Sequence, residues 1–417
     1  MRGRKGGKMR IRHTLDQTRK ARTKPGRRRL RASWGTIVSA LVLLAAACAS
    51  SGSTKATTGQ CQPDSQKLKR QTLPSWVKVP DINTLKTRGN VGEKPSWNTD
   101  VKITAGQVQQ VCAKHLRAAF LNWSSGAYNQ AVLAGAKDAL EAMGIDLVAV
   151  TNYNFDEAAL QTDVLNVMAL NPDIIFYSGV DPTADRAALQ PAVNAGVAVV
   201  SFANAPGEWT TGKPNNFVTL ISYDTQGNGA AVADEVAKKF PNGAKLGMIF
   251  FDANYKLVNE REQGFVDELS KTNVKIAVRE PMSDPHKTQE ITTAMLARYP
   301  DLDMIFAPWD LPADGVFAAL HAANKNIPVA HIDLGFTGAT QIACGTGPIF
   351  VMSSQLVYEW GRTGAIAAAL HELGRPVPPY IVVPVFAVTK DNLKQGWDLA
   401  YGGLVPLPAE ARKCLGQ

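Results

Sequence analysis

Short apolar runs alternate with segments of helical periodicity between residues 116 and 223. The apolar runs cover residues 116–121, 145–150, 174–177, 197–202 and 217–222. Between the first two runs, apolar side chains recur every three or four positions, as Val132, Ala136, Leu140 and Met143 do. This alternation predicts βαβ units, in which a parallel sheet is covered by helices on both faces. Ligands bind such sheets at the carboxyl ends of the strands, so we expect functional side chains there.

Helix boundary signals support these divisions. Asp181 is followed directly by Pro182, which is typical of a helix start because aspartate caps a first turn and proline fits the first helical position. Gly144 and Gly196 stand where two of the helices should end. We therefore expect helices to begin or end at these residues.

The same pattern begins again after Tyr223 and Asp224 with new segments. Strands are expected at residues 246–251, 275–279, 304–308, 329–334, 350–354 and 380–388, with helices at 233–240, 259–270, 288–298, 313–323 and 358–373. The predicted fold class is therefore α/β, with two similar Rossmann-like lobes, each a parallel sheet flanked by helices. Hinge crossovers are expected to join the lobes, which should face one another across a cleft.

The positive charge of the chain is concentrated at its amino terminus. The 417 residues carry a formal charge of +9, but residues 1–47 hold 14 Lys or Arg and one acid, Asp16. The remainder holds 31 basic and 35 acidic residues. Because the basicity belongs to this segment alone, it gives no support for nucleic-acid binding by the lobes.

An apolar run of signal-peptide length follows the basic segment, at residues 34–47. It ends in Leu44-Ala45-Ala46-Ala47-Cys48, which resembles the bacterial lipobox. By this resemblance residues 1–47 are a lipoprotein signal peptide and Cys48 is the lipid-bearing residue. The protein is then expected to be exported and anchored on the outer face of a bacterial cytoplasmic membrane. The alternative is an ordinary signal peptide with an incidental cysteine.

Four further cysteines, Cys61, Cys112, Cys344 and Cys414, favour two disulfides in an exported chain. Three connectivities are possible, and we favour Cys61–Cys112 with Cys344–Cys414. Each of these pairs ties a terminal extension to its nearest folded element. No pair has C-x-x-C spacing, which argues against a zinc site. Residues 48–113 are predicted to be a tether and an extended surface arm.

Several segments resemble the type I periplasmic binding proteins, in particular the ribose/galactose-type solute receptors of ABC importers. They are residues 135–144, Asn171-Pro172-Asp173, residues 194–200, residues 260–265, the run from Tyr299 to Asp310, and Ile332-Asp333. The resemblance covers about residues 114–390. It implies an N-terminal lobe of residues 114–222 and 356–382, a C-terminal lobe of residues 223–355 and 383–400, and a tail of residues 401–417. It also implies a small-molecule ligand, an ABC transporter permease as partner and no cofactor, and we expect a monomer.

The first ligand loop departs from the family pattern. Tyr128 and Asn129 align with the two phenylalanines of the family's Asn-Pro-Phe-Phe loop, and Trp123 adds an aromatic ring nearby. Trp123 can alternatively serve as a lid over the core. Asn204 stands where family members often carry Asp-Arg. Fewer aromatic rings and no charged clamp at this position suggest a ligand other than ribose.

The second lobe provides the remaining ligand residues implied by the resemblance. They are Arg261, Trp309, Asp310, Asp333 and Gln355. Arg261 has the alternative of a surface ion pair with a neighbouring glutamate. We expect Asp310 to cap the following helix because it precedes Leu311-Pro312. Asp333 has the alternative of a hinge hydrogen bond.

Signatures of catalysis are missing from the sequence. It contains no G-x-S-x-G, H-E-x-x-H or P-loop motif, so an enzyme is not expected. A sugar-responsive repressor would need a DNA-binding segment where this chain has a signal peptide. A sensory receptor working with a membrane signalling partner stays open beside the importer receptor. The ligand is equally compatible with a sugar, a polyol or a cyclitol.

Overall fold

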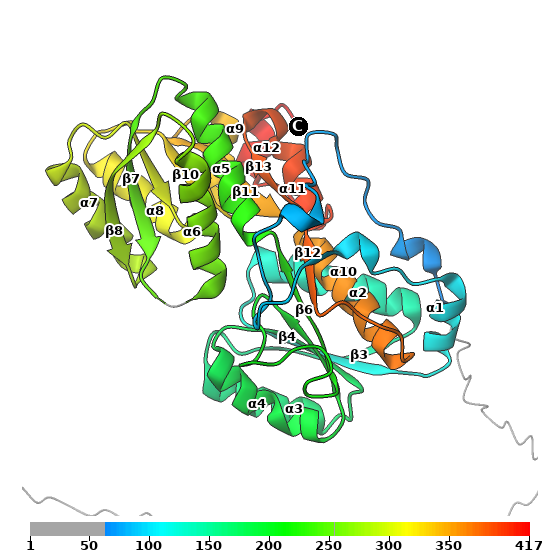
Figure 1. The fold of residues 1–417 in the computed structure, drawn as a ribbon. Helices are drawn as coiled ribbons and strands as arrows, with labels where there is room; N and C mark the ends of the chain where they lie inside the picture. The colour runs from blue at the N-terminus through cyan, green and yellow to red at the C-terminus, as the bar shows by residue number, and fades with distance from the viewer. Residues whose placement is uncertain (1–62, 254) are drawn as a thin grey trace, which may run out of the picture. The chain divides into compact units, whose positions relative to one another are not determined.

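Two mainly parallel β-sheets organise residues 63–253 and 255–417, the part of the chain that this computed structural model describes (Figure 1). Across the first sheet the order is β1 (Ser96–Trp97), β12 (Tyr380–Val383), β6 (Phe217–Tyr223), β5 (Ala198–Phe202), β4 (Ile174–Ser178), β2 (Arg117–Asn122) and β3 (Asp146–Asn152). All its pairings are parallel. Each apolar run expected between residues 116 and 223 forms a strand, which confirms the sequence-based pattern.

The second sheet has the same character. Its order is β13 (Val385–Val388), β11 (Ile349–Gln355), β10 (Val329–Ile332), β9 (Met304–Ala307), β7 (Lys245–Phe251) and β8 (Lys275–Met282). Only the pairing of β13 with β11 is antiparallel among those described for this sheet. The predicted α/β class with two helix-flanked sheets is confirmed.

Helices cover both faces of the first sheet. On one face α2 (Ala127–Met143) and α10 (Val357–Glu372) pack against Phe120 and Phe176, while on the other α3 (Glu157–Met168) and α4 (Pro182–Asn194) pack against Leu121 and Tyr177. Successive strand residues thus enter opposite cores, as the two-residue period of a strand requires. Asp181 caps α4 by accepting from the backbone amides of Thr183 and Ala184, at 2.8 and 3.0 Å.

The second sheet is covered in the same way. One face packs against α5 (Thr225–Lys239) and α6 (Lys256–Leu269). The other packs against α7 (Thr288–Arg298), α8 (Asp310–Ala322) and α9 (Phe336–Cys344). The chain passes from one sheet to the other between β6 and α5, between β11 and α10, and between β12 and β13.

The arm that precedes the lobes is more structured than the sequence suggested. It contains the short 3-10 turns η1 (Ser65–Leu68), η2 (Ile82–Thr84) and η3 (Asn98–Asp100), strand β1 and helix α1 (Ala105–Cys112). Thr104 and Gln107 form a capping box at the start of α1, a spacing that sequence reasoning overlooked. The arm also buries Val77, Leu85, Trp97 and Val101, so part of it packs into the folded lobes as well as lying on the surface.

A buried ionic cluster fixes the arm to α10. Arg70 donates to Glu359 Oε2 at 2.9 Å and to the carbonyl oxygens of Asn98 and Val101 at 2.6 and 3.0 Å. Arg362 donates to the other oxygen of Glu359 at 3.2 Å. The side chains of Glu359 and Arg362 are only 2% and 4% exposed. Arm and helix therefore share one set of charges that neither satisfies alone.

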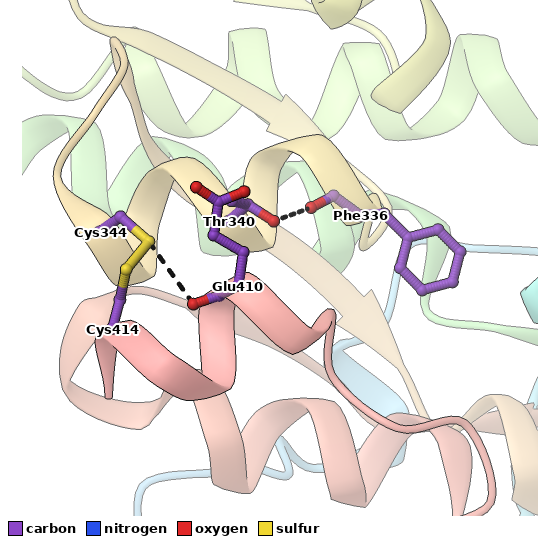
Figure 2. The surroundings of a disulfide bond; sticks show 5 residues. All are labelled: Phe336, Thr340, Cys344, Glu410 and Cys414. Carbon is purple, nitrogen blue, oxygen red and sulfur yellow. Dashed lines mark hydrogen bonds between the residues drawn. A yellow bond between two sulfur atoms is a disulfide. The ribbon is translucent and has the colours of Figure 1, made fainter. Parts of the chain in front are cut away.

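A disulfide holds the carboxyl-terminal end of the chain. The last two helices of the chain are α11 (Leu393–Tyr401) and α12 (Ala409–Cys414). The 3-10 turn η5 (Lys390–Asn392) precedes α11, and a similar turn, η4 (Pro285–Lys287), precedes α7. Cys414 bonds to Cys344 at the end of α9, so α12 lies beside α9 (Figure 2). This pairing is confirmed. The proposed partner of Cys112, Cys61, lies outside the described residues, as do Cys48 and the proposed signal peptide.

Within residues 63–253 and 255–417, no helix has the length and the apolar character that crossing a bilayer requires.

Candidate functional site

Two residues at the carboxyl ends of strands have unusual backbone geometry. Ala203 follows β5 with φ of 66°, and Asp333 follows β10 with φ of 69°. A left-handed conformation costs non-glycine residues on the order of 1–3 kcal/mol and is concentrated at functional sites. In this protein the left-handed residues are Ala203, which directly precedes Asn204, and Asp333 itself. Asn204 and Asp333 are both among the ligand residues expected from the sequence.

Arg261 and Asp333 form an ion pair. Arg261 Nη1, on α6, donates to Asp333 Oδ2 at 2.8 Å and to the Tyr223 hydroxyl at 3.2 Å. Burial opposes the charged guanidinium, but Asp333 and Tyr223 more than offset that effect and raise the pKa of Arg261 above its usual value. The alternative of a surface pair with Glu260 or Glu262 is excluded by this geometry.

Tyr128 and Gln355 join elements of the two sheets. Gln355, at the end of β11, donates from Nε2 to the Tyr128 hydroxyl at 3.0 Å. Its Oε1 lies 3.5 Å from Nδ2 of Asn228 on α5. Burial raises the pKa of the Tyr128 hydroxyl well above its ordinary value. This tyrosine therefore stays protonated and acts as a hydrogen-bonding group.

Trp123, which directly follows β2 of the first sheet, belongs to a group of stacked aromatic rings. Its ring stacks on Tyr128 with centroids 6.2 Å apart and on Phe155 at 6.3 Å. Phe155 is 59% exposed, so this stack extends from the core toward solvent. Sequence reasoning missed Phe155, although it follows β3 as Trp123 follows β2. Stacked rings of this kind can cover the apolar face of a ligand.

A buried tryptophan, Trp360, packs against both Tyr128 and Tyr223. Trp360, on α10, is 1% exposed. Its ring stacks on Tyr223 at 5.5 Å and meets Tyr128 edge-on at 5.7 Å. One buried side chain therefore positions Tyr128, which contacts Gln355, and Tyr223, which contacts Arg261. This role becomes visible only in the tertiary packing.

Asn129 serves the loop before it. Its Nδ2 donates to the Ser124 carbonyl at 3.0 Å, while its buried Oδ1 makes no hydrogen bond. Asn129 thus holds the loop that carries Trp123, and its Oδ1 can still accept a hydrogen bond.

Asn204 and Tyr255 link the first sheet to α6. Asn204 is 4% exposed and donates to the Gly179 carbonyl at 3.2 Å. Burial raises the pKa of the Tyr255 hydroxyl, and a hydrogen bond with the Asn204 side chain opposes this shift. Arg261 and Asp333 also act electrostatically on Tyr255. Sequence reasoning missed Tyr255, whose only signal was its position shortly after the β7 run.

Trp309 and Asp310 make separate contacts. The Trp309 ring meets Phe251 edge-on with centroids 5.2 Å apart. The expected capping role of Asp310 was wrong: the N-cap of α8 is Trp309, without a side-chain cap bond, and Asp310 is the first helical residue. The first three amides of a helix have no intrahelical acceptor, so Pro312 is tolerated at the third position as well as the first. That tolerance places the helix start one residue earlier than expected.

A pocket of about 520 Å³ lies between the loop after β5 and helix α6. Its lining consists of Asn90, Pro182, Asn204, Gln226, Tyr255, Lys256, Asn259, Glu260 and Gln263. Of the residues expected from sequence, only Asn204 lines this pocket. The structure thus brings Tyr128, Arg261, Asp333 and Gln355 into one connected group, and four residues of the pocket lining lie on α6, the helix that carries Arg261.

The connected group is suited to hydrogen bonding. It contains one ion pair, an amide and the hydroxyls of Tyr128 and Tyr223, and burial raises the pKa of both hydroxyls. Such groups can donate and accept without exchanging protons near neutral pH. Among residues 63–253 and 255–417, no set of three His, Cys, Asp or Glu residues is arranged to hold a metal ion.

Comparison with known proteins gives consistent matches. A family model described as a periplasmic binding protein domain matches residues 118–375. The ribose import binding protein of Haemophilus influenzae is 25% identical over 214 residues, which are 51% of this chain and 70% of that protein. Its counterpart in Escherichia coli strain K12 is 24% identical over 237 residues, 56% of this chain and 77% of that protein.

Solved structures share the fold. An ABC transporter solute-binding protein from Agrobacterium vitis, bound with alpha-D-tagatopyranose, has a TM-score of 0.60 at 22% identity, covering 69% of this chain and 99% of that one. A 5-methylthioribose transporter solute-binding protein from Thermotoga lettingae has a TM-score of 0.56 at 21% identity, covering 73% and 97%. At these identities the likeness concerns the fold alone.

Proposed function

The chain belongs to the periplasmic binding protein domain family, and from this premise we propose that it is an extracytoplasmic receptor for a small polyhydroxylated ligand. The ligand is a sugar, polyol or cyclitol, and the receptor delivers it to the permease of an ABC importer. The curated relatives named above are ribose import binding proteins, which supports this ligand class.

The observation that carries the proposal is the Arg261–Asp333 pair. The Arg261 side chain is 5% exposed and the Asp333 side chain 23% exposed. Asp333 therefore keeps part of its carboxylate accessible while Arg261 holds it in position. A fixed carboxylate and guanidinium can accept from and donate to vicinal hydroxyls, and we assign to Trp123 and Trp309 the role of covering apolar C–H faces.

The ligand residues divide between two lobes. We assign residues 114–222 and 356–382 to the N-terminal lobe, and residues 223–355 and 383–400 to the C-terminal lobe. Trp123, Tyr128, Asn129 and Asn204 belong to the first, and Arg261, Trp309, Asp310, Asp333 and Gln355 to the second. A ligand that contacts both sets favours the closed arrangement through its extra contacts there. The crossovers at residues 222–224 and at Gln355 then absorb the hinge rotation.

The ligand is expected to differ from ribose. Tyr128 and Asn129 replace the two phenylalanines of the resembling family, and Asn204 replaces its charged clamp. These changes exchange aromatic area and charge for neutral hydrogen-bonding groups, which favours a ligand with more hydroxyls or a different ring orientation.

Export and anchoring complete the proposal. The segment from residue 34 to Cys48 supports a lipoprotein signal peptide and attachment through Cys48 to the outer face of the cytoplasmic membrane. We propose that the receptor acts there as a monomer, since it has to pass its ligand directly to the permease.

A thermal-shift screen tests the binding function. Ligand bound by the folded state raises the melting temperature by mass action, so monosaccharides, polyols and cyclitols are screened at millimolar concentration. At least one should raise the melting temperature, and calorimetry should then give one site per chain. No shift with any of the three classes would contradict the proposal. Small-angle scattering with the identified ligand should show compaction.

A further inference from the structure

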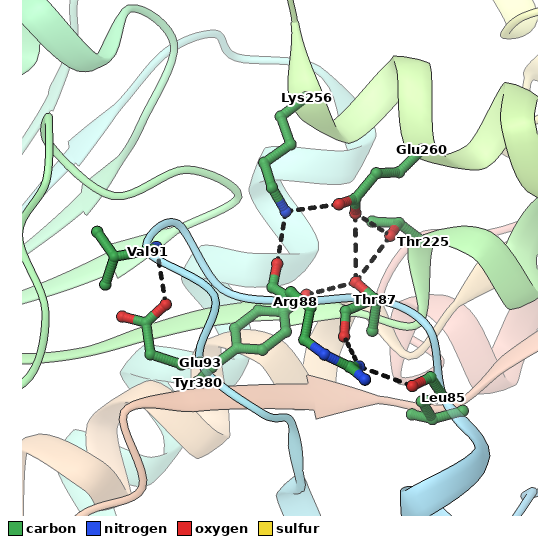
Figure 3. Close-up of polar contacts among 9 residues, drawn as sticks. All are labelled: Leu85, Thr87, Arg88, Val91, Glu93, Thr225, Lys256, Glu260 and Tyr380. Carbon is green, nitrogen blue, oxygen red and sulfur yellow. Dashed lines mark hydrogen bonds and ion pairs between the residues drawn. The ribbon is translucent and has the colours of Figure 1, made fainter.

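A segment of the amino-terminal arm, residues 85–93, contacts elements of both sheets (Figure 3). The hydroxyl of Thr87 lies 2.9 Å from the hydroxyl of Tyr380 on β12 and 2.9 Å from that of Thr225 on α5. Thr87 is fully buried. The segment is therefore held at the junction of the two lobes by hydrogen bonds to each of them.

Neighbouring residues extend this attachment. Lys256, on α6, donates to the backbone carbonyl of Arg88 and, at 2.6 Å, to Glu260. Asn90 donates to the Ala205 carbonyl at 3.2 Å, just after β5. With contacts to α6 on one side and to the β5 loop on the other, the arm forms one wall of the space between the lobes.

This wall is part of the 520 Å³ pocket described above. Its volume lies in the range of about 300–1,000 Å³ that is typical of small-molecule sites. Asn90 comes from the arm, Asn204 from the first sheet, and Asn259 and Gln263 from α6. Asn90 lies outside residues 118–375, the part of the chain that the family model matches. The arm therefore adds a wall that the matched domain alone lacks.

The lining indicates what the pocket can hold. Five of its nine residues carry side-chain amides: Asn90, Asn204, Gln226, Asn259 and Gln263. Four of these amides already donate within the protein: Asn90 to the Ala205 carbonyl at 3.2 Å, Asn204 to the Gly179 carbonyl at 3.2 Å, Asn259 to the Ala253 carbonyl at 3.1 Å and Gln263 to Asp267 at 2.6 Å. Their side-chain oxygens can still accept from the hydroxyl groups of a ligand, and Gln226 can both donate and accept. The two charges of the lining, Lys256 and Glu260, pair with each other at 2.6 Å. The pocket thus has many neutral hydrogen-bonding groups and no unpaired charge, which favours an uncharged, hydroxylated occupant.

Helix α6 connects the pocket to the Arg261–Asp333 pair. Tyr255 is the N-cap residue of α6, and it lines the pocket together with Asn259 and Glu260 of the same helix. Arg261 follows Glu260 directly on α6 and donates to Asp333 at 2.8 Å. The pocket and the ion pair are therefore built on the same turns of one helix, so a ligand of two rings can reach from one to the other.

We propose that this pocket is a second subsite, which binds an uncharged hydroxylated ring attached to the ring held at Arg261 and Asp333. The ligand is then of disaccharide size, and the arm helps to determine that specificity. This inference rests on the proposed function as a sugar receptor, and it names the ligand class of the same site.

The test compares the affinities of the full-length chain for monosaccharides and for disaccharides. Calorimetry measures binding of D-glucose and D-galactose and of maltose, cellobiose, trehalose, lactose and melibiose, which are built from those two sugars. Gln263→Trp fills the pocket from an exposed position on α6 and should leave the fold intact. Gln289→Trp is the matched control, because Gln289 is exposed on α7, which covers the opposite face of the second sheet.

We expect at least one disaccharide to bind at least tenfold more tightly than either monosaccharide. Gln263→Trp should remove that advantage, and Gln289→Trp should keep it. Monosaccharides that bind as tightly as every disaccharide would overturn the subsite while leaving the receptor function in place. The subsite is also overturned if Gln263→Trp keeps the advantage. Absence of binding by all these sugars and by the polyols and cyclitols of the first screen would overturn both proposals.

Discussion

The carboxylate of Asp333 lies 2.8 Å from the guanidinium of Arg261, although 72 positions separate the two residues in sequence. Asp333 reaches this position with a left-handed backbone, φ 69°. Arg261 is buried among Tyr223 and the residues of α6, whereas Asp333 keeps an exposed edge. One ion pair therefore supports both the fold and the surface that we assign to the ligand.

Asp333→Ala should weaken ligand binding and lower stability together. Removing one partner of a buried charged hydrogen bond costs about 2–5 kcal/mol of binding free energy. Because the buried Arg261 then keeps its charge without a partner, the free energy of unfolding should also fall by roughly 3 kcal/mol. Calorimetry measures the first effect and urea unfolding the second.

A double variant separates these effects. Arg261→Met with Asp333→Ala removes both charges, so most of the lost stability should return while ligand affinity stays low. A folded Asp333→Ala protein that binds as tightly as the parent would show that the ligand does not contact Asp333.

Glu359→Gln should destabilise the protein strongly. Glu359 is 2% exposed and is shared by Arg70 of the arm and Arg362 of α10, so its replacement leaves two partly or wholly buried cations without a counter-charge. We expect a loss of about 3–5 kcal/mol in the free energy of unfolding. Asp398→Asn is the control, since it breaks the exposed Lys394–Asp398 pair and should cost less than about 1 kcal/mol. Equal losses in the two variants would contradict a role for burial.

Local patterns made much of the fold predictable. The strands within residues 116–223 are marked by continuous apolar runs, and Asp181 caps α4 as its position before Pro182 indicated. Gly144 ends α2 with φ of 70°, a conformation that glycine adopts without strain. These features depend on residues close together in sequence, so the sequence specifies them directly.

Contacts between distant segments were not predictable. Arg70 resembles any arginine of a polar arm until Glu359 is placed beside it, and Tyr255 gains meaning only next to Asn204. Asp333 and Gln355 were found through a family resemblance, but Trp360, which supports two of the site tyrosines, was not. Burial and pairing arise from tertiary packing, which periodicity does not encode.

The Cys344–Cys414 disulfide should stabilise the carboxyl-terminal helices. It closes a loop with a sequence separation of 70, and the restriction of the unfolded chain by such a loop contributes roughly 4 kcal/mol. Replacing both cysteines by serine should lower the free energy of unfolding by about that amount. Mass spectrometry of the parent after alkylation without reductant should find neither Cys344 nor Cys414 modified. An unchanged unfolding midpoint in the double variant would contradict this assignment.

Cys48→Ala should abolish lipid attachment. Cys48 follows three alanines at the end of an apolar run, the arrangement of a lipobox, and alanine has no thiol to carry an acyl chain. Metabolic labelling with a fatty-acid probe in a bacterial host should mark the parent and not the variant. Cys344→Ser is the control and should keep the label. Equal labelling of Cys48→Ala and the parent would remove the lipid anchor from the proposal.

Asp310→Asn should make the protein more stable above neutral pH. Burial, and then repulsion by Asp333, raise the pKa of Asp310 from 3.8 to about 7. Between those two values the unfolded chain has released this proton while the folded chain still holds it. Raising the pH through this window therefore favours the unfolded state, and the penalty is complete above about pH 7. Asparagine has no proton to release, so it avoids this penalty.

The difference between variant and parent isolates Asp310 from the other buried acids. Urea unfolding at pH 4, 6 and 8 should show an advantage for Asp310→Asn that is smallest at pH 4 and reaches about 1–3 kcal/mol at pH 8. Asp391→Asn is the control, because Asp391 is exposed and its replacement should give no such trend. An advantage that stays constant across the three pH values would mean that the ionisation of Asp310 does not oppose folding.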